Sequence, residues 1–205
     1  MRNQLKWQAG TCFKLFLLTG ISIAAVLIFF SCQKSREQVF LKIGLPEEPR
    51  SMNIWLGTDA NSRKILSLIY QPLFRRDLET LEMIPWLAKK NPIFDKEALT
   101  YTVKLRQAKW SDGSDFTSQD VLFTRRLFLD FKIPRYYSSW KIIKKIEAPD
   151  AHTIVFHLNV PSAIFMSRIM TAPMVSKKEW EKVAKKALKK KNPLRALQDH
   201  LVKMP

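Results

Sequence analysis

The sequence is poor in the residues from which most catalytic and metal sites are built. It has only two cysteines, three histidines and five glycines among 205 residues. So few glycines leave little room for a glycine-rich phosphate loop, and there is no Gly-x-Ser-x-Gly motif and no clear pair of nucleophile and base. His152, His157 and His200 are too scattered to suggest a metal site. We therefore expect no catalytic residue, no metal and no cofactor, and predict that the chain is not an enzyme.

Acidic residues are also scarce. Eighteen Asp and Glu stand against 35 Lys and Arg, which gives a formal net charge of +17. In a cytoplasmic protein this excess would suggest nucleic-acid binding. The N-terminus argues against that compartment, because Arg2, Lys6 and Lys14 precede an uncharged apolar run over 15–30, a pattern typical of an export signal. We therefore predict an exported protein on the periplasmic or cell-surface side of a membrane, with no nucleic-acid partner.

Cys32 suggests how the exported chain is held at that membrane. It follows the apolar run as the cysteine of a bacterial lipobox does, although Phe29 stands where lipoboxes usually have leucine. The alternatives are an uncleaved signal anchor, for which the run is shorter than the ~20 residues of a spanning helix, and a cysteine without a role. Cys12 lies inside the signal region, so we expect no structural disulfide. We predict a signal peptide over 1–32, lipid attachment at Cys32 and a polar tether over 33–38.

The rest of the chain predicts a mixture of strands and helices. Short apolar runs or strict alternation predict strands over 39–45, 99–106, 141–148 and 152–158, with Pro149 and Asp150 turning between the last two as in a hairpin. Helical spacing predicts one helix capped by Asp59 or Asn61 and ended by Pro72, and another beginning at Ser176 with Glu179 in a capping box. The fold class is therefore α/β or α+β.

The stretch Trp110–Val121 predicts a turn followed by the start of a helix. Asp112-Gly113 is suited to a tight turn, because glycine is free to adopt positive φ. Thr117 is a good N-cap, and Asp120, three residues on, can reach back to the Thr117 amide. Phe116 and Val121 flank this cap as a hydrophobic staple does. These features shape a scaffold and carry no chemistry of their own.

These residues nevertheless resemble a conserved order found in the extracellular solute-binding proteins of family 5, which serve importers of di- and oligopeptides, nickel and some sugars. The matching residues are Thr100-Tyr101-Thr102, Leu105-Arg106, Trp110, Asp112-Gly113, Phe116-Thr117 and Asp120-Val121. Further blocks in the family's order are Ser51–Asn53, Ile69–Leu73, Pro85–Ala88, Ala148–Asp150 and Thr153–Leu158. The resemblance extends over about 41–180.

The resemblance implies an α/β, type II periplasmic-binding-protein-like fold with two lobes, of which only the N-terminal part is present here. Residues 39–72 would begin lobe I, 73–170 would form a small mixed β/α subdomain of that lobe, and 171–205 would return into it before lobe II. The implied function is the substrate-binding component of an ABC importer, which captures peptides or a related small solute and delivers them to permease subunits. The alternative is an exported, membrane-anchored basic domain that binds anionic surfaces or partner proteins.

Two groups of residues correspond to ligand-contacting positions of such relatives. The first is the loop before the first long helix, Thr58, Asp59, Ala60 and Asn61, where free helix amides favour carboxylates and carbonyls. The simpler interpretation is that Asp59 and Asn61 only cap the helix. The second group, Tyr136, Tyr137 and Trp140, corresponds to aromatic residues near the mouth of the cleft. Ordinary packing in the core or at the surface is the alternative for these three.

The helix predicted after Ser176 is rich in lysine. Its basic residues are Lys177, Lys178, Lys182, Lys185, Lys186, Lys189, Lys190 and Lys191, against Glu179 and Glu181. Trp180, Val183, Ala184, Ala187 and Leu188 are expected to form its buried face. The lysine face has three interpretations: a solvated outer surface, attraction to anionic lipid headgroups, or nucleic-acid binding.

Overall fold

The computed structural model of the protein describes residues 41–202. The predicted signal peptide, Cys32 and the tether lie outside these residues. The described architecture belongs to one compact unit that begins at Leu45. Over 41–202, none of the helices has both the length and the apolar character needed to cross a bilayer.

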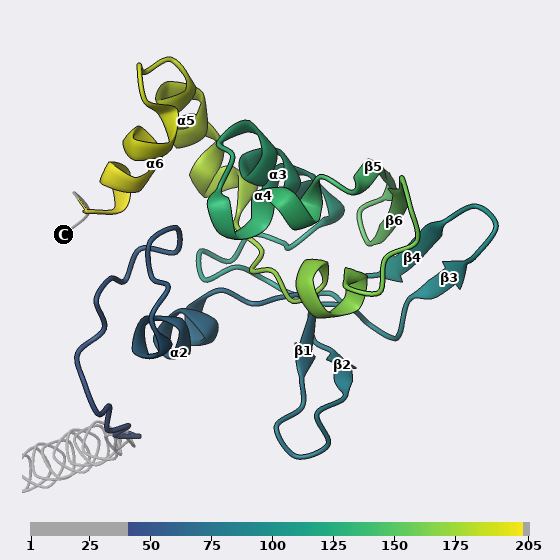
Figure 1. Ribbon diagram of the computed structural model, residues 1–205, viewed down its shortest axis with the longest axis horizontal. Helices are drawn as coiled ribbons and strands as arrows, with labels where there is room; N and C mark the ends of the chain where they lie inside the picture. Colours follow the sequence, from purple (N-terminus) through teal and green to yellow (C-terminus); the bar gives the residue numbers. More distant parts are fainter. Residues whose placement is uncertain (1–40, 203–205) are drawn as a thin grey trace, which may run out of the picture. The chain divides into compact units, whose positions relative to one another are not determined.

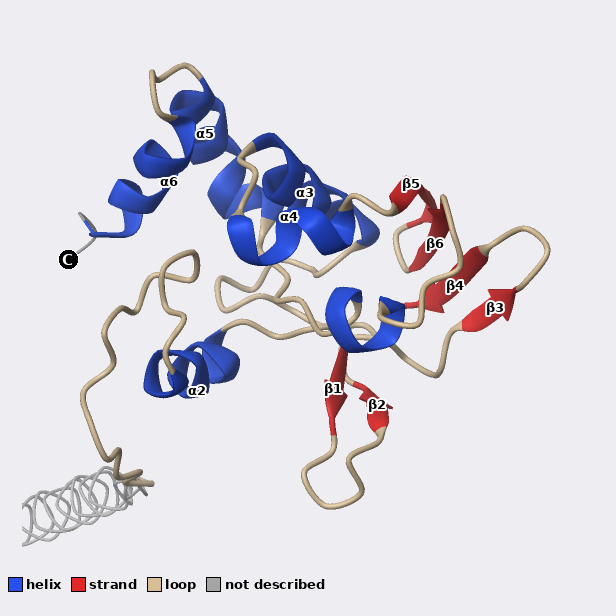
Figure 2. Cartoon of the chain, in the orientation of Figure 1, coloured by secondary structure: helices blue, strands red, loops and turns tan. Residues whose placement is uncertain are grey.

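A four-stranded antiparallel sheet, in the order β3-β4-β6-β5, forms one side of this unit (Figures 1 and 2). Its strands are β3 (Ile93–Asp95), β4 (Thr100–Lys104), β5 (Ile143–Asp150) and β6 (Thr153–Leu158). The β5–β6 hairpin confirms the prediction, but β5 continues through Pro149 instead of ending before it. Pro149 is tolerated because β5 is an edge strand whose pairing register shifts between Glu147 and Asp150.

The strand predicted over 99–106 is confirmed as β4, which is shorter at both ends. Val103 is fully buried, and the Tyr101 ring stacks on Phe165 with centroids 4.0 Å apart. Leu99 has a φ of 51°, so the chain enters the strand only at Thr100. The prediction of a strand over 39–45 is wrong for its described part, 41–45, which has no regular structure. None of the described strands pairs with 41–45, so a strand there would leave its backbone groups without ladder partners.

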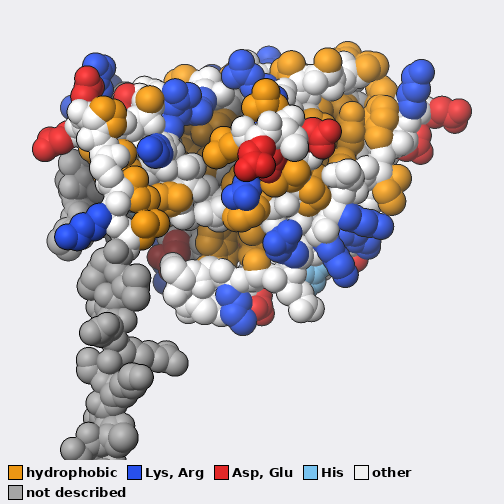
Figure 3. Space-filling view, turned by 90° about the horizontal axis from the view of Figure 1, so that it is seen from below, with side chains coloured by type: hydrophobic (Ala, Val, Ile, Leu, Met, Phe, Trp, Pro, Cys, Tyr) orange, Lys and Arg blue, Asp and Glu red, His pale blue; other side chains and the backbone are white. Residues whose placement is uncertain are grey.

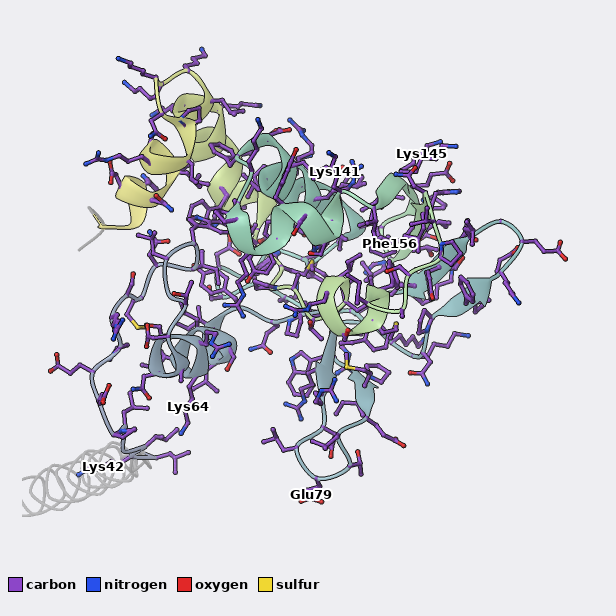
Figure 4. The ribbon with its side chains drawn as sticks, viewed as in Figure 1. Lys42, Lys64, Glu79, Lys141, Lys145 and Phe156 are labelled. Carbon is purple, nitrogen blue, oxygen red and sulfur yellow. The ribbon has the colours of Figure 1, made fainter. Side chains whose placement is uncertain are left out.

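A separate two-stranded ladder joins β1 (Phe74–Arg76) to β2 (Met83–Pro85), and Glu79 lies in the loop between them (Figure 4). At the base of β1 the chain meets a segment that comes about a hundred residues later. The Phe74 amide donates to Met170 O at 2.9 Å, and the Met174 amide donates to Gln71 O at 3.0 Å. These hydrogen bonds join the chain just before and within β1 to the segment that follows η1.

The helices are α2 (Ala60–Ile69), α3 (Ser118–Asp130), α4 (Pro134–Trp140), α5 (Lys177–Leu188) and α6 (Pro193–Val202), with a short π-helix, η1 (Phe165–Ile169). Asp59, not Asn61, is the N-cap of α2.

Helix α5 ends at Leu188, so Lys189–Lys191 lie in the connection to α6. Leu188, predicted to lie on the buried face with Trp180, Ala184 and Ala187, is instead 42% exposed, because it is the last residue of the helix.

The stretch Trp110–Val121 folds as predicted. Gly113 has a φ of 81°, and Thr117 and Asp120 form a reciprocal capping box at the start of α3. The buried Asp120 also does something that its spacing does not predict: its second carboxylate oxygen, Oδ1, accepts a 2.8 Å hydrogen bond from the Lys177 amide at the start of α5. One carboxylate therefore accepts a backbone amide at the start of each of two helices, in addition to their N-caps Thr117 and Ser176.

The core lies between the sheet and the helices. Phe128 of α3 is fully buried and contacts Tyr136 and Trp140 of α4, with ring centroids 4.3 and 5.0 Å apart. Phe156 of β6 points inward, 5.4 Å from the Phe165 ring (Figure 4). On the outside, hydrophobic side chains form broad patches with Lys and Arg spread among them on the face shown in Figure 3.

Candidate ligand-binding pocket

A hollow of about 190 Å³ lies where α2, the start of α4 and the segment after η1 meet. Its lining is largely apolar or aromatic, with a few polar and two basic side chains. The lining residues are Ile54, Gly57, Arg63, Leu66, Ser67, Tyr70, Pro72, Arg135, Tyr136, Thr171 and Pro173. Complete ligand pockets typically enclose roughly 300–1,000 Å³. The hollow is therefore suited to one part of a ligand, such as a side chain or an end group.

Gly57 allows the loop before α2 to lie against that helix. A Cβ atom at this position would stand 2.6 Å from Leu66 Cδ1 and 2.8 Å from the Ser51 carbonyl oxygen. Asn53 holds the same loop: its Oδ1 accepts from the Trp55 amide at 2.8 Å, and its Nδ2 donates to Gln198 O of α6 at 2.7 Å. The wall of the pocket is thus fixed by a close backbone approach and by one buried amide.

The side chain of Asp59 forms the N-cap of α2. Its Oδ1 accepts from the Ser62 amide at 2.9 Å and its Oδ2 accepts from the Ser62 hydroxyl. These bonds hold the pKa of the Asp59 carboxyl below its usual range, with the hydroxyl bond as the largest cause. Thr58, Asp59, Ala60 and Asn61 lie at the N-terminal end of α2, and none of them lines the hollow. Arg63, one turn further along, does.

Of the three aromatic residues predicted near the ligand, only Tyr136 lines the pocket. Tyr136 lines the pocket, and burial raises the pKa of its hydroxyl, an effect that the nearby Arg135 guanidinium partly offsets. Tyr137 is half-buried and is not part of the lining. Trp140 is completely buried against Phe128, so its side chain is a core residue and does not reach the pocket. The position of Trp140 therefore agrees with the alternative of ordinary packing in the core.

Sequence reasoning missed the two basic residues of the pocket, Arg63 and Arg135. They are 72 positions apart and come together only through tertiary packing. One local signal was available for Arg63, since it shares a helical face with Leu66 and Tyr70, three and seven positions further along. No comparable signal points to Arg135.

The pocket is lined by apolar side chains, hydroxyl groups and guanidinium groups, and its lining includes no Asp, Glu, His or Cys. Elsewhere in the described part of the chain, no three His, Cys, Asp or Glu side chains gather in a way that could hold a metal ion. The arrangement can therefore receive an uncharged or negatively charged group.

The lysine face of α5 is mostly exposed. Lys178 pairs with Asp112 at 2.6 Å, and Lys185 pairs with Glu181 at 3.2 Å. The Lys178 ammonium is the main cause that lowers the pKa of the Asp112 carboxyl, followed by hydrogen bonds from Ser114. Lys182, Lys186 and Lys190 follow one another at four-residue steps beside a shallow hollow between α5 and α6. This pattern agrees with a solvated face and identifies no ligand.

Comparisons with known proteins agree with this fold. Residues 82–196 match the family described as Bacterial extracellular solute-binding proteins, family 5 Middle. A putative ABC transporter peptide-binding protein of Brucella ovis is 34% identical over 107 residues, which are 52% of this chain and 20% of the relative. The Glutathione-binding protein GsiB of Escherichia coli O1:K1 is 30% identical over 173 residues, 82% of this chain and 33% of the relative.

Among solved structures, the binding protein AgaA of A. tumefaciens R10 in complex with agropinic acid superposes with a TM-score of 0.61 at 26% identity. The superposition covers 67% of this chain and 28% of AgaA. This chain thus spans about a fifth to a third of the length of the proteins that it matches. The likeness confirms that the chain has part of the predicted periplasmic-binding-protein fold.

Proposed function

The chain belongs to the bacterial extracellular solute-binding proteins of family 5, and from this premise we propose that it contributes to the capture of peptides or a related small solute for import. The observation that carries the proposal is the family match over 82–196, which includes all four strands of the sheet and helices α3, α4 and α5. The named relatives are a peptide-binding and a glutathione-binding protein. These relatives give no support to the alternative of a basic interaction domain.

In this proposal the hollow between α2 and α4 is the part of the solute site that this chain supplies. Its apolar floor with a few polar groups is the usual composition of a small-molecule site. Tyr136 would contact the solute directly, while the loop Thr58–Asn61 would lie beside it and Tyr137 near the rim. No catalytic step is proposed, because the lining offers neither a nucleophile with a base nor a group of metal ligands.

The division of the chain into lobe and subdomain is part of the same proposal. Residues 39–72 would begin lobe I, 73–170 would form the subdomain, and 171–205 would return into the lobe. The hydrogen bonds between Gln71 and Met174 and between Phe74 and Met170 support this division, since the chain leaves and re-enters at neighbouring points.

The partners and location that we propose follow from the family, whose members are extracellular. The solute would pass to ABC permease subunits in the cytoplasmic membrane. Lipid on Cys32, or an uncleaved signal anchor, would hold the chain at the membrane surface.

Calorimetric titration of the full 205-residue chain with di- and tripeptides and with glutathione tests the proposal. Binding of at least one of these solutes is expected. Ser67→Trp should weaken it at least tenfold, because the indole would fill the hollow that Ser67 lines. Lys64→Trp on the same exposed side of α2 lies outside the lining and is the matched control (Lys64 in Figure 4). Absence of binding by every solute, or equal effects of the two variants, would contradict the proposal.

A further inference from the structure

Two guanidinium groups line the hollow from different elements. Arg63 projects from α2, and Arg135 lies near the start of α4. The Cζ atom of Arg135 stands 5.7 Å from the centroid of the Tyr136 ring, another lining group, which keeps the guanidinium close to the pocket wall. Both arginines are exposed, so their positions need no rearrangement for a solute to reach them.

Neither arginine has an acidic partner within the described chain. The six ion pairs formed by residues 41–200 all involve other groups. Asp59 is four positions before Arg63 on α2, the spacing at which an ion pair usually forms on a helix. Its carboxylate instead accepts hydrogen bonds from Ser62. The lining contains no Asp or Glu, so the positive charge at the pocket is uncompensated.

The same hollow is also lined by apolar side chains. Ile54, Leu66, Pro72 and Pro173 contribute to the floor. A guanidinium group is planar, is weakly hydrated and can hold a carboxylate with two parallel hydrogen bonds. Beside an apolar wall such bonds are stronger than in open solvent.

From this geometry we propose that the pocket selects a solute that carries a carboxylate next to an apolar group, with the carboxylate held by Arg63 and Arg135 and the apolar group seated on the floor. This inference rests on the proposed solute capture and names the class of solute. A peptide C-terminus and an acidic side chain both offer this chemistry.

The direct test is titration of the full chain with hexanoate and with hexanamide, which differ only in the charged end. Hexanoate should bind at least tenfold more tightly, the factor expected from one charge-assisted hydrogen-bond pair. Arg63→Gln and Arg135→Gln should each remove most of this preference. Lys64→Gln removes the same charge from an exposed position of α2 outside the lining and should leave the preference within about twofold, as screening of surface charges predicts. Unchanged thermal unfolding shows that the exposed variants fold.

Three peptides distinguish the two sources of the carboxylate. Ala-Ala-Leu has a free C-terminal carboxylate, its C-terminal amide has none, and Ala-Glu-Leu-amide has one on a side chain only. Tighter binding of either acid than of Ala-Ala-Leu-amide, lost in both arginine variants, would support the inference and identify the source.

Equal binding of all three peptides, unaffected by the arginine variants, would overturn the inference but leave the proposal of solute capture intact. A preference for hexanoate without any peptide binding would contradict peptide capture and support the anion site. Equal binding of hexanoate and hexanamide would overturn the anion site.

Discussion

The junction around Asp120 and the pocket beside α2 use polar groups in opposite ways. At the junction the side chains of Asp120 and Thr124 have partners inside the chain: Asp120 accepts from the Thr117 and Lys177 amides, and Thr124 Oγ1 accepts from the Val175 amide and donates to Asp120 O. At the pocket, Arg63 and Arg135 point to a hollow and have no acidic partner among the described residues. Groups paired inside the chain maintain a scaffold, whereas exposed charged groups that only water solvates are available to a ligand.

The largest expected effect comes from breaking the junction. Asp120→Ala leaves the Thr117 amide at the N-cap of α3 and the Lys177 amide at the start of α5 without their acceptor. It should lower the free energy of unfolding by about 2–4 kcal/mol, since one cap contributes ~1 kcal/mol and buried charge-assisted bonds more. Urea unfolding measures the change. Asp115→Asn, at an exposed carboxyl in the same loop, is the control. If the two variants were equally stable, the double cap would have no energetic importance.

A smaller loss is expected at the wall of the pocket. Gly57→Ala places a methyl group 2.8 Å from the Ser51 carbonyl oxygen and should cost about 1–3 kcal/mol of unfolding free energy, as overpacking usually does. Gly44→Ala meets no atom within 4 Å and should change stability little. Thermal unfolding of both variants makes the comparison. A neutral Gly57→Ala would mean that the loop and α2 separate easily.

The smallest expected effect concerns acid. The pKa of Asp112 lies below its unfolded value because of Lys178 and Ser114, and that of Asp59 does so because of Ser62. The stabilisation is therefore complete above the unfolded pKa, near pH 4, and is lost as the pH falls below it through the lower folded values. In urea unfolding between pH 2 and pH 5, Asp112→Asn should make the fall in stability shallower. An unchanged slope would show that the exposed Lys178 pair contributes nothing, as many surface pairs do.

The local parts of the fold could be predicted from the sequence. Thr117 and Asp120 are three residues apart, so their capping box is visible in the sequence alone, and the alternation of β4 marks its buried face. The second bond of Asp120 could not be predicted, because Lys177 is 57 residues away. The pocket was harder still. Tyr136 and Trp140 are four residues apart on one helix, so only their different contacts with the rest of the chain determine which one faces the hollow.

The double cap also bears on the order of folding. The first turn of a helix is its most costly step, because several residues must be fixed for one hydrogen bond. Helix α5 has its own N-cap, Ser176, whose hydroxyl accepts from the Glu179 amide, but the partner of its first amide is the Asp120 carboxylate of α3. We expect α5 to join late, because a chain that is still emerging during synthesis places Asp120 before Lys177. A single carboxylate would thus link the stability of α5 to the prior formation of α3.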